Sequence, residues 1–400
     1  MGAYQSISEA PAAAEGARAA PEGLRIGLIA LAAACVYAAV WPAVTGDMND
    51  YLVPWYDTIL ARGRVGAFAE PFGNYTPPYL YLLSAVSLFD GLLAKVTLIK
   101  LLSVAGVAAL AWAVARLVGA AGVERPWRAA LWVFLLPSVV LNAPAMGQCD
   151  AIWAAACIAA VAETVERRPA AMLVWCGVAI AFKAQAVFIA PFIISRLLAE
   201  RTPWHLWAIP PLVYGAAMLP AWLMGWPAAD LATIYLRQTE WGPDFLGNAP
   251  NPWAWAQHFF AEAGAGYRWV GHAAAAAAAL AYVVVFGRRR LGARGLVAAA
   301  LLAAIMLPWL LPKMHERFFF LADLLAFALA AIRRDRIGVA VAVLVQAGSV
   351  LALGGLLAAS SWPAMVGSVA MLAAAGLTLR CMRGEDAGPE AGQAAERLAI

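Results

Sequence analysis

Long apolar stretches alternate with short polar segments along nearly the whole chain. Many of these stretches approach the length of about 20 residues that an α-helix needs to cross the hydrocarbon core of a membrane. The pattern predicts an all-α polytopic membrane protein with about 12 transmembrane helices, within a range of 11 to 13. The predicted spans are residues 24–44, 94–118, 129–142, 150–165, 170–184, 185–199, 204–224, 269–286, 295–311, 316–332, 337–356 and 362–380.

The composition agrees with this class of protein. Hydrophobic residues make up 64% of the chain and charged residues 13%. A soluble protein of this length needs more polar surface to cover its core, so the apolar excess is expected to face lipid. The 5 cysteines form no CxxC pair and the 4 histidines are scattered, which indicates neither a disulfide framework nor a zinc site. We therefore expect no metal or other cofactor, and no nucleic-acid partner.

The positions of the arginines predict the topology, because cytoplasmic loops of membrane proteins are enriched in Lys and Arg. With 12 spans the arginine-rich segments and both termini fall on one side. Both termini are then predicted to be cytoplasmic. The segments concerned contain Arg125 and Arg128, Arg167 and Arg168, Arg196 and Arg201, Arg288 to Arg290 with Arg294, Arg333 to Arg336, and Arg380 with Arg383.

Two segments are assigned by the same rule. Residues 78–92 are apolar but short, and counting them as a span would move every later arginine-rich loop to the other side. They are predicted to form a re-entrant or interfacial helix. Residues 170–199 are predicted to form two short helices that turn near Lys183, rather than one long helix.

Residues 24–383 are predicted to form one transmembrane domain between two disordered cytoplasmic tails, residues 1–23 and 384–400. Two long loops, residues 45–93 and 225–268, fall on the outer side, and the first is expected to carry the interfacial helices. These loops are rich in Trp, Tyr, Pro, Asn and Asp, whereas the inner loops are short and basic. Any chemistry is therefore expected on the outer face, towards the periplasm or exterior.

The first outer loop begins with three carboxylates, Asp47, Asp50 and Asp57, in the stretch GDMNDYLVPWYD. Asp50 could cap a short interfacial helix over residues 51–62, since Asp is a favoured N-cap. Asp47 precedes that helix and follows a glycine, so a structural role explains it less well. A carboxylate at the membrane surface beside Trp55 is well placed to act as a general base.

A second polar cluster, LPKMHERFF at residues 311–319, lies between two predicted spans. It contains Lys313, His315, Glu316 and Arg317. At the start of a helix these cations would reinforce the affinity of the free backbone N–H groups for an anion. The alternative is that Lys313 and Arg317 extend to the membrane interface, but four ionisable residues in five positions are poorly explained in that way.

Two further motifs carry polar residues next to apolar runs. Lys183 and Gln185 lie in AFKAQA, and an ionisable residue at that depth is costly enough to be a functional candidate. Gln148 and Asp150 lie in NAPAMGQCD at another outer helix start, where Asp150 could also be a simple N-cap.

The ordered set of motifs resembles a known group of proteins. GDMNDY, NYTPPYLYLLS, NAPAMGQCDAIW, AFKAQAVFIAP and LPKMHERFFFLAD, within residues 24–335, are similar to bacterial membrane mannosyltransferases related to the second mannosyltransferase of GPI-anchor assembly. Parts are similar to the dolichyl-phosphate-glucose glucosyltransferases of N-glycan assembly, which carry GD, YPP, FKQ and HEK patterns. All of these belong to the glycosyltransferase-C superfold, so the resemblance implies that fold.

The resemblance also implies an activity. Members of the superfold transfer a sugar, with inversion, from a polyprenyl or dolichyl phosphate on the non-cytoplasmic side, with a carboxylate of the first outer loop as base. Asp47 is then the expected base, with Asp50 as the second candidate. His315, Arg317 and Lys183, with Lys313, are expected at the donor phosphate. Other candidates for substrate binding are Trp55, Tyr75, Gln148, Asp150, Gln185, Glu316, Asn248 and Asn251.

The chain departs from the glucosyltransferase pattern, with YTPP for YPP and HER for HEK. The identities of the sugar and the acceptor therefore cannot be inferred from the glucosyltransferases. We expect a hexose, with mannose favoured, to be moved from a polyprenyl-phosphate donor to a lipid-linked, glycan or protein acceptor in contact with membrane lipid. A different function class stays open at this point. A secondary transporter or lipid flippase would also use membrane-embedded Lys and Asp residues.

Overall fold

A computed structural model of the chain describes residues 21–240, 248–260 and 266–383, and the regular structure of these ranges is helical. This confirms the predicted all-α class. The two predicted tails lie almost wholly outside the described residues, as does part of the second long outer loop.

In the described ranges, 7 helical spans are long and apolar enough to cross a membrane, and up to 8 if a bent pair of shorter helices counts as one span. The short η6 (Trp204–Ala208) continues into α10 and belongs to that span. The long helices are α1 (Glu22–Val40), α4 (Lys95–Ala120), α10 (Ile209–Leu223), α13 (Gly266–Phe286), α14 (Ala293–Leu310), α16 (Arg336–Leu357) and α17 (Trp362–Arg383).

The other predicted spans are shorter helices or helix pairs, so all twelve predicted segments are helical. The bent pair has an angle of 50° at its break. The two short helices predicted within 170–199 are present, and Lys183 is the extended residue that separates them. The shorter helices are α5 (Trp127–Val133), α6 (Pro137–Val140), η4 (Leu141–Ala145), α7 (Asp150–Val165), α8 (Pro169–Phe182), η5 (Ala184–Ile189), α9 (Ala190–Ala199) and α15 (Phe320–Arg333).

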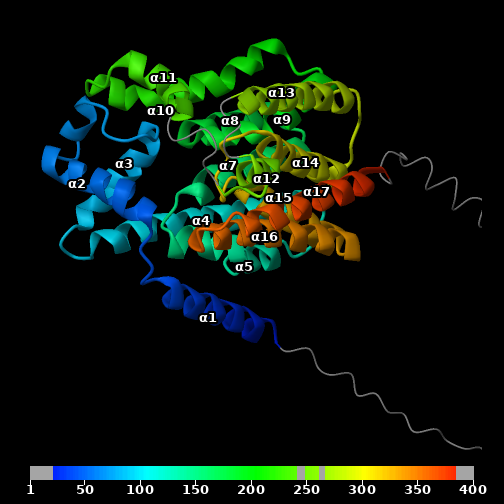
Figure 1. Ribbon diagram of the computed structural model, residues 1–400, viewed down its shortest axis with the longest axis horizontal. Coiled ribbons are helices and arrows are strands. Elements are labelled where there is room, and N and C mark those ends of the chain that lie inside the picture. Colours follow the sequence, from blue (N-terminus) through cyan, green and yellow to red (C-terminus); the bar gives the residue numbers. More distant parts are fainter. Residues whose placement is uncertain (1–20, 241–247, 261–265, 384–400) are drawn as a thin grey trace, which may run out of the picture.

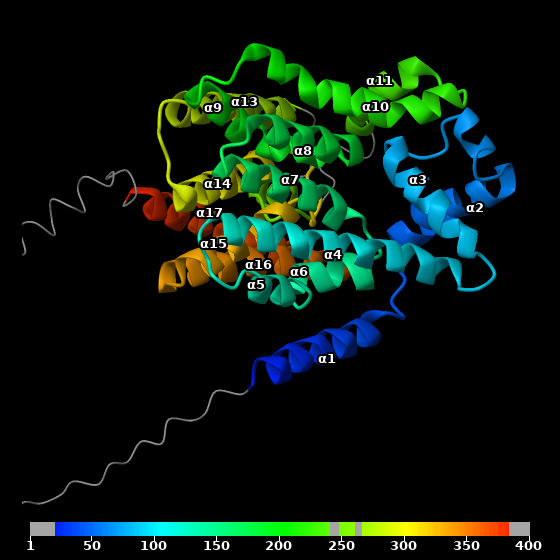
Figure 2. The same cartoon turned by 180° about the vertical axis from the view of Figure 1, so that it is seen from behind.

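Both of the long loops, residues 45–93 and 225–268, contain short helices in their described parts. α3 with η3 covers most of the segment predicted to be re-entrant or interfacial, and it is too short to span a membrane. α2 and α3 lie together at one end of the molecule, next to α10 and α11 (Figures 1 and 2). The elements of these loops are η1 (Met48–Leu52), α2 (Val53–Arg62), η2 (Gly66–Ala69), α3 (Pro77–Val86), η3 (Ser87–Phe89), α11 (Ala228–Glu240) and α12 (Pro252–Phe259).

α7 lies at the centre of the bundle, with nearly every residue buried. Its many alanines let α4 approach closely, which is how helices pack in membranes. Gly106 of α4 faces the first turn of α7, and a Cβ at that position would come within 2.8 Å of Cγ1 of Ile152. This contact fixes the start of α7, where Asp150 lies.

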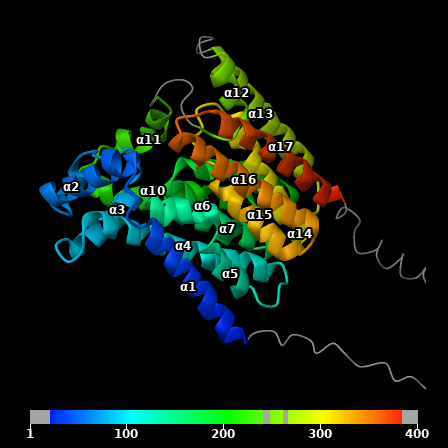
Figure 3. The same ribbon diagram turned by 60° about the horizontal axis from the view of Figure 1, so that its bottom comes forward.

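Ion pairs join helix ends on the side of the molecule away from α2 and α3. Arg116 of α4 bonds to Glu163 of α7 and to Glu166, the residue after the end of α7, at 2.6 and 2.8 Å. Glu22, at the start of α1, pairs with Arg128 at 3.0 Å. α1 has no buried residue and lies at the margin of the bundle (Figure 3). The polar network described below is at the opposite ends of these helices.

Candidate active site

The first site segment enters a helix earlier than the sequence predicts. The π-helical turn η1 begins at Met48 and runs directly into α2, so Asp50 lies inside the turn, is exposed and makes no capping hydrogen bond. The expectation that Asp50 caps the helix is therefore wrong. Pro54 has no N–H that could donate to the carbonyl group four residues before it. The π-helical turn ahead of Pro54 does not require that hydrogen bond. Asp47 immediately precedes η1.

Lys100 of α4 anchors the chain that leads to Asp47. Its Nζ donates to the carbonyl oxygens of Trp41 and Ala43 at 2.7 and 2.6 Å, and the side chain is fully buried. A cation that extends to the membrane interface would be exposed, and Lys100 is not. The ammonium instead satisfies carbonyl groups at the end of α1, which an isolated helix end leaves without partners.

A close backbone approach joins this segment to the chain before α7. Gly147 has φ +68°, and a Cβ there would collide with Cε of Met48. Glycine adopts this left-handed conformation without steric cost and leaves room for the methionine. The next residue, Gln148, is buried, and its Nε2 donates to Oδ2 of Asp47 at 3.1 Å. The predicted candidates Asp47 and Gln148 are thus in direct contact.

The LPKMHERFF segment forms turns ahead of α15 rather than its first helical turn. Lys313 has φ +57°, and α15 starts only at Phe320. Glu316 and Arg317 therefore lie before the helix, and the predicted anion site at a helix N-terminus is not formed by these residues. The left-handed residue after Pro312 turns the chain back towards Asp47. Such irregular backbone is tolerated at membrane depth where protein buries it.

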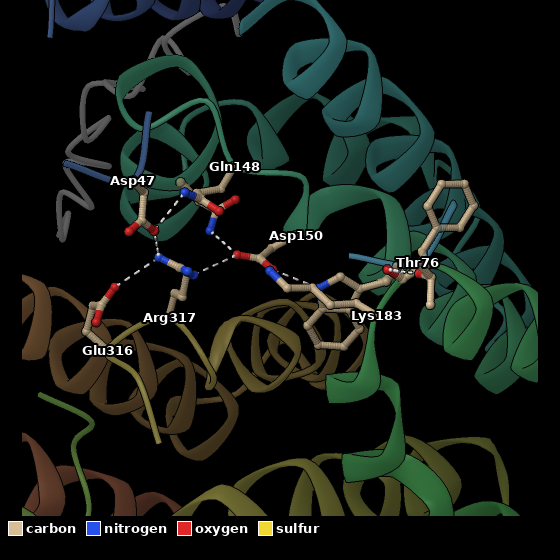
Figure 4. A network of polar contacts seen from close by, with 10 residues as sticks. Asp47, Thr76, Gln148, Asp150, Lys183, Glu316 and Arg317 are labelled. Carbon is tan, nitrogen blue, oxygen red and sulfur yellow. Dashed lines mark hydrogen bonds and ion pairs between the residues drawn. The ribbon is translucent and has the colours of Figure 1, made fainter. Parts of the chain in front are cut away.

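Arg317 is the centre of the network (Figure 4). Its Nη1 donates to Oδ2 of Asp47 at 2.5 Å and to Oε1 of Glu316 at 3.4 Å. Its Nε lies 3.7 Å from Oδ2 of Asp150. Three carboxylates thus surround one guanidinium, whose Nη2 makes no hydrogen bond within the described part of the chain.

Asp150 joins Arg317 to Lys183. Lys183 Nζ donates to Oδ1 of Asp150 at 2.5 Å, and both side chains are buried. Oδ1 also accepts from Trp153 Nε1 at 2.9 Å, and Oδ2 accepts from Asn142 Nδ2 at 2.8 Å. The carboxylate makes no capping hydrogen bond at the start of α7, so the simple N-cap interpretation does not hold. Buried charges need such partners because burial without them is very costly.

Tyr75 closes one side of this cluster. The Lys183 ammonium lies 4.9 Å from the centre of its ring, a cation–π distance. Trp55 and Tyr79 contact the same ring, with centroids 5.0 and 5.5 Å away. Tyr75 and Trp55, both predicted for substrate binding, therefore form an aromatic wall above Lys183.

The network differs in exposure from one end to the other. The side chain of Asp47 is 32% exposed and that of Arg317 15%, whereas Asp150 is 2% exposed. His315 is 44% exposed and lies 3.9 Å from Glu316. Partial burial and the Arg317 guanidinium lower the pKa of the His315 imidazole. The accessible end of the site thus presents Asp47, Arg317 and a His315 that is neutral at neutral pH.

Other predicted residues are not part of the hydrogen-bonded network. Asn251 caps α12 and donates to the carbonyl groups of Pro308 and Leu311. Asn248 donates to the carbonyl of Ser360. Gln185 is half-buried, and its Oε1 has no hydrogen-bond partner among the described residues. Asp57, the third carboxylate of the first loop, pairs with Lys95 instead.

Sequence reasoning missed Asn142, Trp153 and Lys100 as parts of the site. Asn142 and Trp153 are the first and last residues of the motif NAPAMGQCDAIW, so their place in that motif was the available signal. Lys100 lies in an apolar run, where its charge was the signal. Within the described ranges, no group of three or more His, Cys, Asp or Glu side chains is arranged as a metal site.

Comparisons with known proteins agree with this picture. Residues 59–199, about a third of the chain, match the family model described as alpha-(1->6)-mannopyranosyltransferase, N-terminal domain. The matched range includes Tyr75, Asp150 and Lys183 but neither Asp47 nor Arg317. No curated protein matches the sequence.

The fold is similar to that of ArnT from Cupriavidus metallidurans, whose crystal structure has undecaprenyl phosphate bound. The TM-score is 0.53 at 14% sequence identity, and the match covers 93% of this chain and 79% of that one. A likeness at this identity concerns the fold, and it confirms the predicted superfold. The chain is therefore a multi-pass membrane protein with a glycosyltransferase-C type of fold, and its residues 59–199 are similar to a mannopyranosyltransferase family.

Proposed function

We propose that this protein transfers a hexose, with mannose favoured, from a polyprenyl-phosphate donor to a hydroxyl group of a lipid-linked, glycan or protein acceptor. Asp47 acts as the general base that removes the proton from the attacking hydroxyl. The attack displaces the lipid phosphate in one step, so the anomeric configuration of the sugar is inverted. Two positions of the chain, Asp47 and Arg317, supply the main groups.

The proposal rests on the hydrogen bonds and the exposure of the Asp47 carboxylate. Its Oδ2 accepts from both Arg317 and Gln148. Its Oδ1 makes no hydrogen bond within the described ranges, and the side chain is partly exposed. A general base needs a fixed orientation and one free oxygen within hydrogen-bond reach of the acceptor hydroxyl. Asp47 meets both requirements, whereas Asp50 is exposed and unanchored.

Arg317 is suited to the leaving phosphate. Its Nη2 is free of hydrogen bonds within the described part of the chain, and planar guanidinium groups bind phosphate oxygens in pairs. The half-exposed His315 can donate a further hydrogen bond from its neutral ring, and Lys313 belongs to the same segment. Charge that develops on the lipid phosphate is then stabilised by fixed donors, without a metal in this proposal.

Lys183 has a different part in this scheme from the one that the sequence suggests. Its ammonium is buried against Asp150 and Tyr75, so it holds Asp150 in place. Asp150 in turn lies beside Arg317. Lys183 therefore positions the phosphate-binding arginine through Asp150.

The donor class has support from the comparisons. The protein of similar fold was crystallised with undecaprenyl phosphate, which supports a polyprenyl phosphate as the lipid carrier here. The matched family model is that of a mannosyltransferase, which supports mannose as the sugar. The arginine pattern supports a site that faces the periplasm or exterior of a bacterial inner membrane, with both termini in the cytoplasm.

The test is direct transfer by the purified protein. Polyprenyl-phosphate donors with radiolabelled mannose, glucose or galactose are incubated with the protein and a native membrane extract, and labelled products are separated and identified. We expect label to move from the mannose donor, with an anomeric configuration opposite to that of the donor in the product. The Asp47→Asn variant is the matched control. If no labelled donor is consumed by wild type beyond the Asp47→Asn background, the proposal is wrong.

A further inference from the structure

A small internal cavity extends from Arg317 into the helix bundle. It has a volume of about 30 Å³, and a cavity needs about 10–15 Å³ to hold one water molecule. The cavity thus has room for two water molecules or one small polar group. Its polar lining consists of Ser138, Asn142, Glu316, Arg317, Asp323 and Ser349.

Two hydrogen-bond acceptors of this lining have no partner in the described part of the chain. Oδ2 of Asp323 and Oδ1 of Asn142 are buried and accept no hydrogen bond. The opposite atoms of both groups are engaged, because Asp323 Oδ1 accepts from Ser349 at 3.0 Å and Asn142 Nδ2 donates to Asp150. Both side chains are therefore held in place, with one open acceptor each.

Such open acceptors inside a membrane protein are unusual. Buried polar groups are nearly always hydrogen-bonded, and an unsatisfied one destabilises the fold. Asp323 is fully buried in the middle of an apolar sequence, where an ionisable residue is costly and marks a functional site by default. Neither the base nor the phosphate site described above uses it.

The polar groups of the lining determine which kind of chemical group the cavity can bind. Two acceptors require a donor of hydrogen bonds, which excludes an apolar group. The Glu316 carboxylate disfavours an anion, and the Arg317 guanidinium, which also lines the cavity, disfavours a cation. A neutral hydroxyl group fits these conditions, since it donates a hydrogen bond to one of the two acceptors and can accept another.

We infer that this cavity binds a hydroxyl-bearing group of a substrate sugar and that Asp323 and Asn142 thereby determine which sugar is accepted. This inference rests on the proposed function, because the cavity opens beside the arginine assigned to the donor phosphate. The hydroxyl group belongs to the donor hexose or to a sugar of the acceptor. Both sugars would offer the same hydroxyl group. In the first case the cavity affects binding of the donor, and in the second case binding of the acceptor.

The experiment compares two ligands that differ only by the sugar. Dissociation constants for polyprenyl phosphate and for polyprenyl-phosphate mannose are measured with purified wild type and with Asp323→Leu. Leaving a buried hydrogen-bonding group without its partner weakens binding by about ten-fold or more. We expect Asp323→Leu to weaken the sugar-bearing ligand by that factor and to leave the affinity for polyprenyl phosphate unchanged. A misfolded variant would lose both.

Donor and acceptor are distinguished by a second measurement. If the hydroxyl group comes from the acceptor, the KM for the acceptor increases in Asp323→Leu while the affinity for the donor stays constant. Monodeoxy mannose donors locate the group within a donor sugar. One deoxy position should weaken binding to wild type and have no further effect in Asp323→Leu, as a double-mutant cycle requires.

Two other variants keep the test decisive. Ser349→Ala retains the carboxylate but removes its hydrogen-bond donor, so it is expected to weaken the same ligand even if Asp323→Leu does not fold. Thr378→Val removes a buried hydroxyl that bonds only within α17 and is expected to leave both affinities unchanged. Unaltered donor affinity and acceptor KM in folded Asp323→Leu and Ser349→Ala would show that the cavity holds only water. Failure of wild type to transfer any sugar would instead refute the proposed function.

Discussion

Asp47 and Arg317 are 270 positions apart in the sequence, and their carboxylate and guanidinium groups approach to 2.5 Å in the fold. The pair connects the first long loop, residues 45–93, with the segment between α14 and α15. It orients one oxygen of Asp47 and leaves the other open, while Nη2 of Arg317 makes no hydrogen bond in the described part of the chain. One contact thus relates the proposed base to the proposed leaving group.

Replacement of Asp47 by Asn tests the base. The amide keeps the shape of the side chain but cannot accept the proton, so transfer should decrease by about 10²–10⁴-fold, the usual contribution of a general base. Donor binding should change little. Single-turnover transfer rates and donor dissociation constants provide the measurement. Asp50→Asn is the control, because Asp50 is exposed and lies outside the network, and it should retain near-normal turnover. Loss of transfer in Asp50→Asn alone would move the base to that residue.

Replacement of Arg317 tests the phosphate site. Arg317→Ala should weaken donor binding by about 1.5–3 kcal/mol, the range for loss of a hydrogen bond to a charged group. Arg317→Lys keeps the charge but not the planar fork, and it should recover only part of that loss. Binding of polyprenyl phosphate without sugar should weaken equally, since the effect is on the phosphate. Arg62→Ala removes an arginine from an exposed ion pair and serves as the control. Full recovery of affinity in Arg317→Lys would contradict paired binding by the guanidinium.

Variants of the buried pair of Lys183 and Asp150 distinguish a structural role of Lys183 from direct binding of the phosphate. Lys183→Met leaves a buried carboxylate without its main partner, and breaking such a pair costs about 3–5 kcal/mol. Adding Asp150→Asn removes the unpaired charge, so the double variant should recover much of the stability. Thermal unfolding in detergent measures this. If Lys183 only positions Arg317, the stable double variant should bind polyprenyl phosphate more weakly than wild type but more tightly than Arg317→Ala. An affinity as low as that of Arg317→Ala would assign the phosphate to Lys183 directly.

The sequence identifies the elements well because its strongest signals are local. Apolar length predicts where each helical segment lies, although only 7, or up to 8, of the described segments are long and apolar enough to cross a membrane. The arginine pattern correctly divides residues 170–199 at Lys183. The motif segments also meet in space, as Asp47, Asp150, Lys183 and Arg317 show. What local signals do not contain is the path of the chain between helices. The left-handed turn at Lys313 delays the start of α15 and moves Arg317 off the helix end.

Partner choice is the other feature that sequence alone does not provide. Asp47 and Asp50 are the same residue type in the same short segment. Only the fold places Gln148 and Arg317 next to Asp47 and leaves Asp50 exposed to solvent. Lys100 illustrates the same point. Its partners are backbone carbonyl groups at the end of another helix, and these have no signature in the sequence.

A pH series tests His315. Its pKa is lowered in the protein, so the ring is neutral at pH 7 and gains a proton only at lower pH than an ordinary histidine. A bound phosphate favours the imidazolium, so binding is coupled to proton uptake by His315. As the pH falls from 7 towards 5, affinity for polyprenyl phosphate should increase in wild type relative to His315→Asn. The comparison is necessary because the phosphate itself gains a proton near pH 6. Parallel curves for the two proteins would show that His315 does not contact the phosphate.

Orientation in the membrane can be tested with single cysteines at two glycines. Gly66 lies in the first outer loop and Gly292 in an arginine-rich loop, and a Cβ at either position has no atom within 4 Å. Either substitution should therefore leave the fold intact. The exposed Cys35 is first replaced by Ser to lower the background. Because arginine-rich loops stay in the cytoplasm, Gly66→Cys should react with an impermeant maleimide in intact cells, and Gly292→Cys only after the inner membrane is permeabilised. The reverse result would place Asp47 and Arg317 in the cytoplasm, where the proposed donor would have to be used from the other face of the membrane.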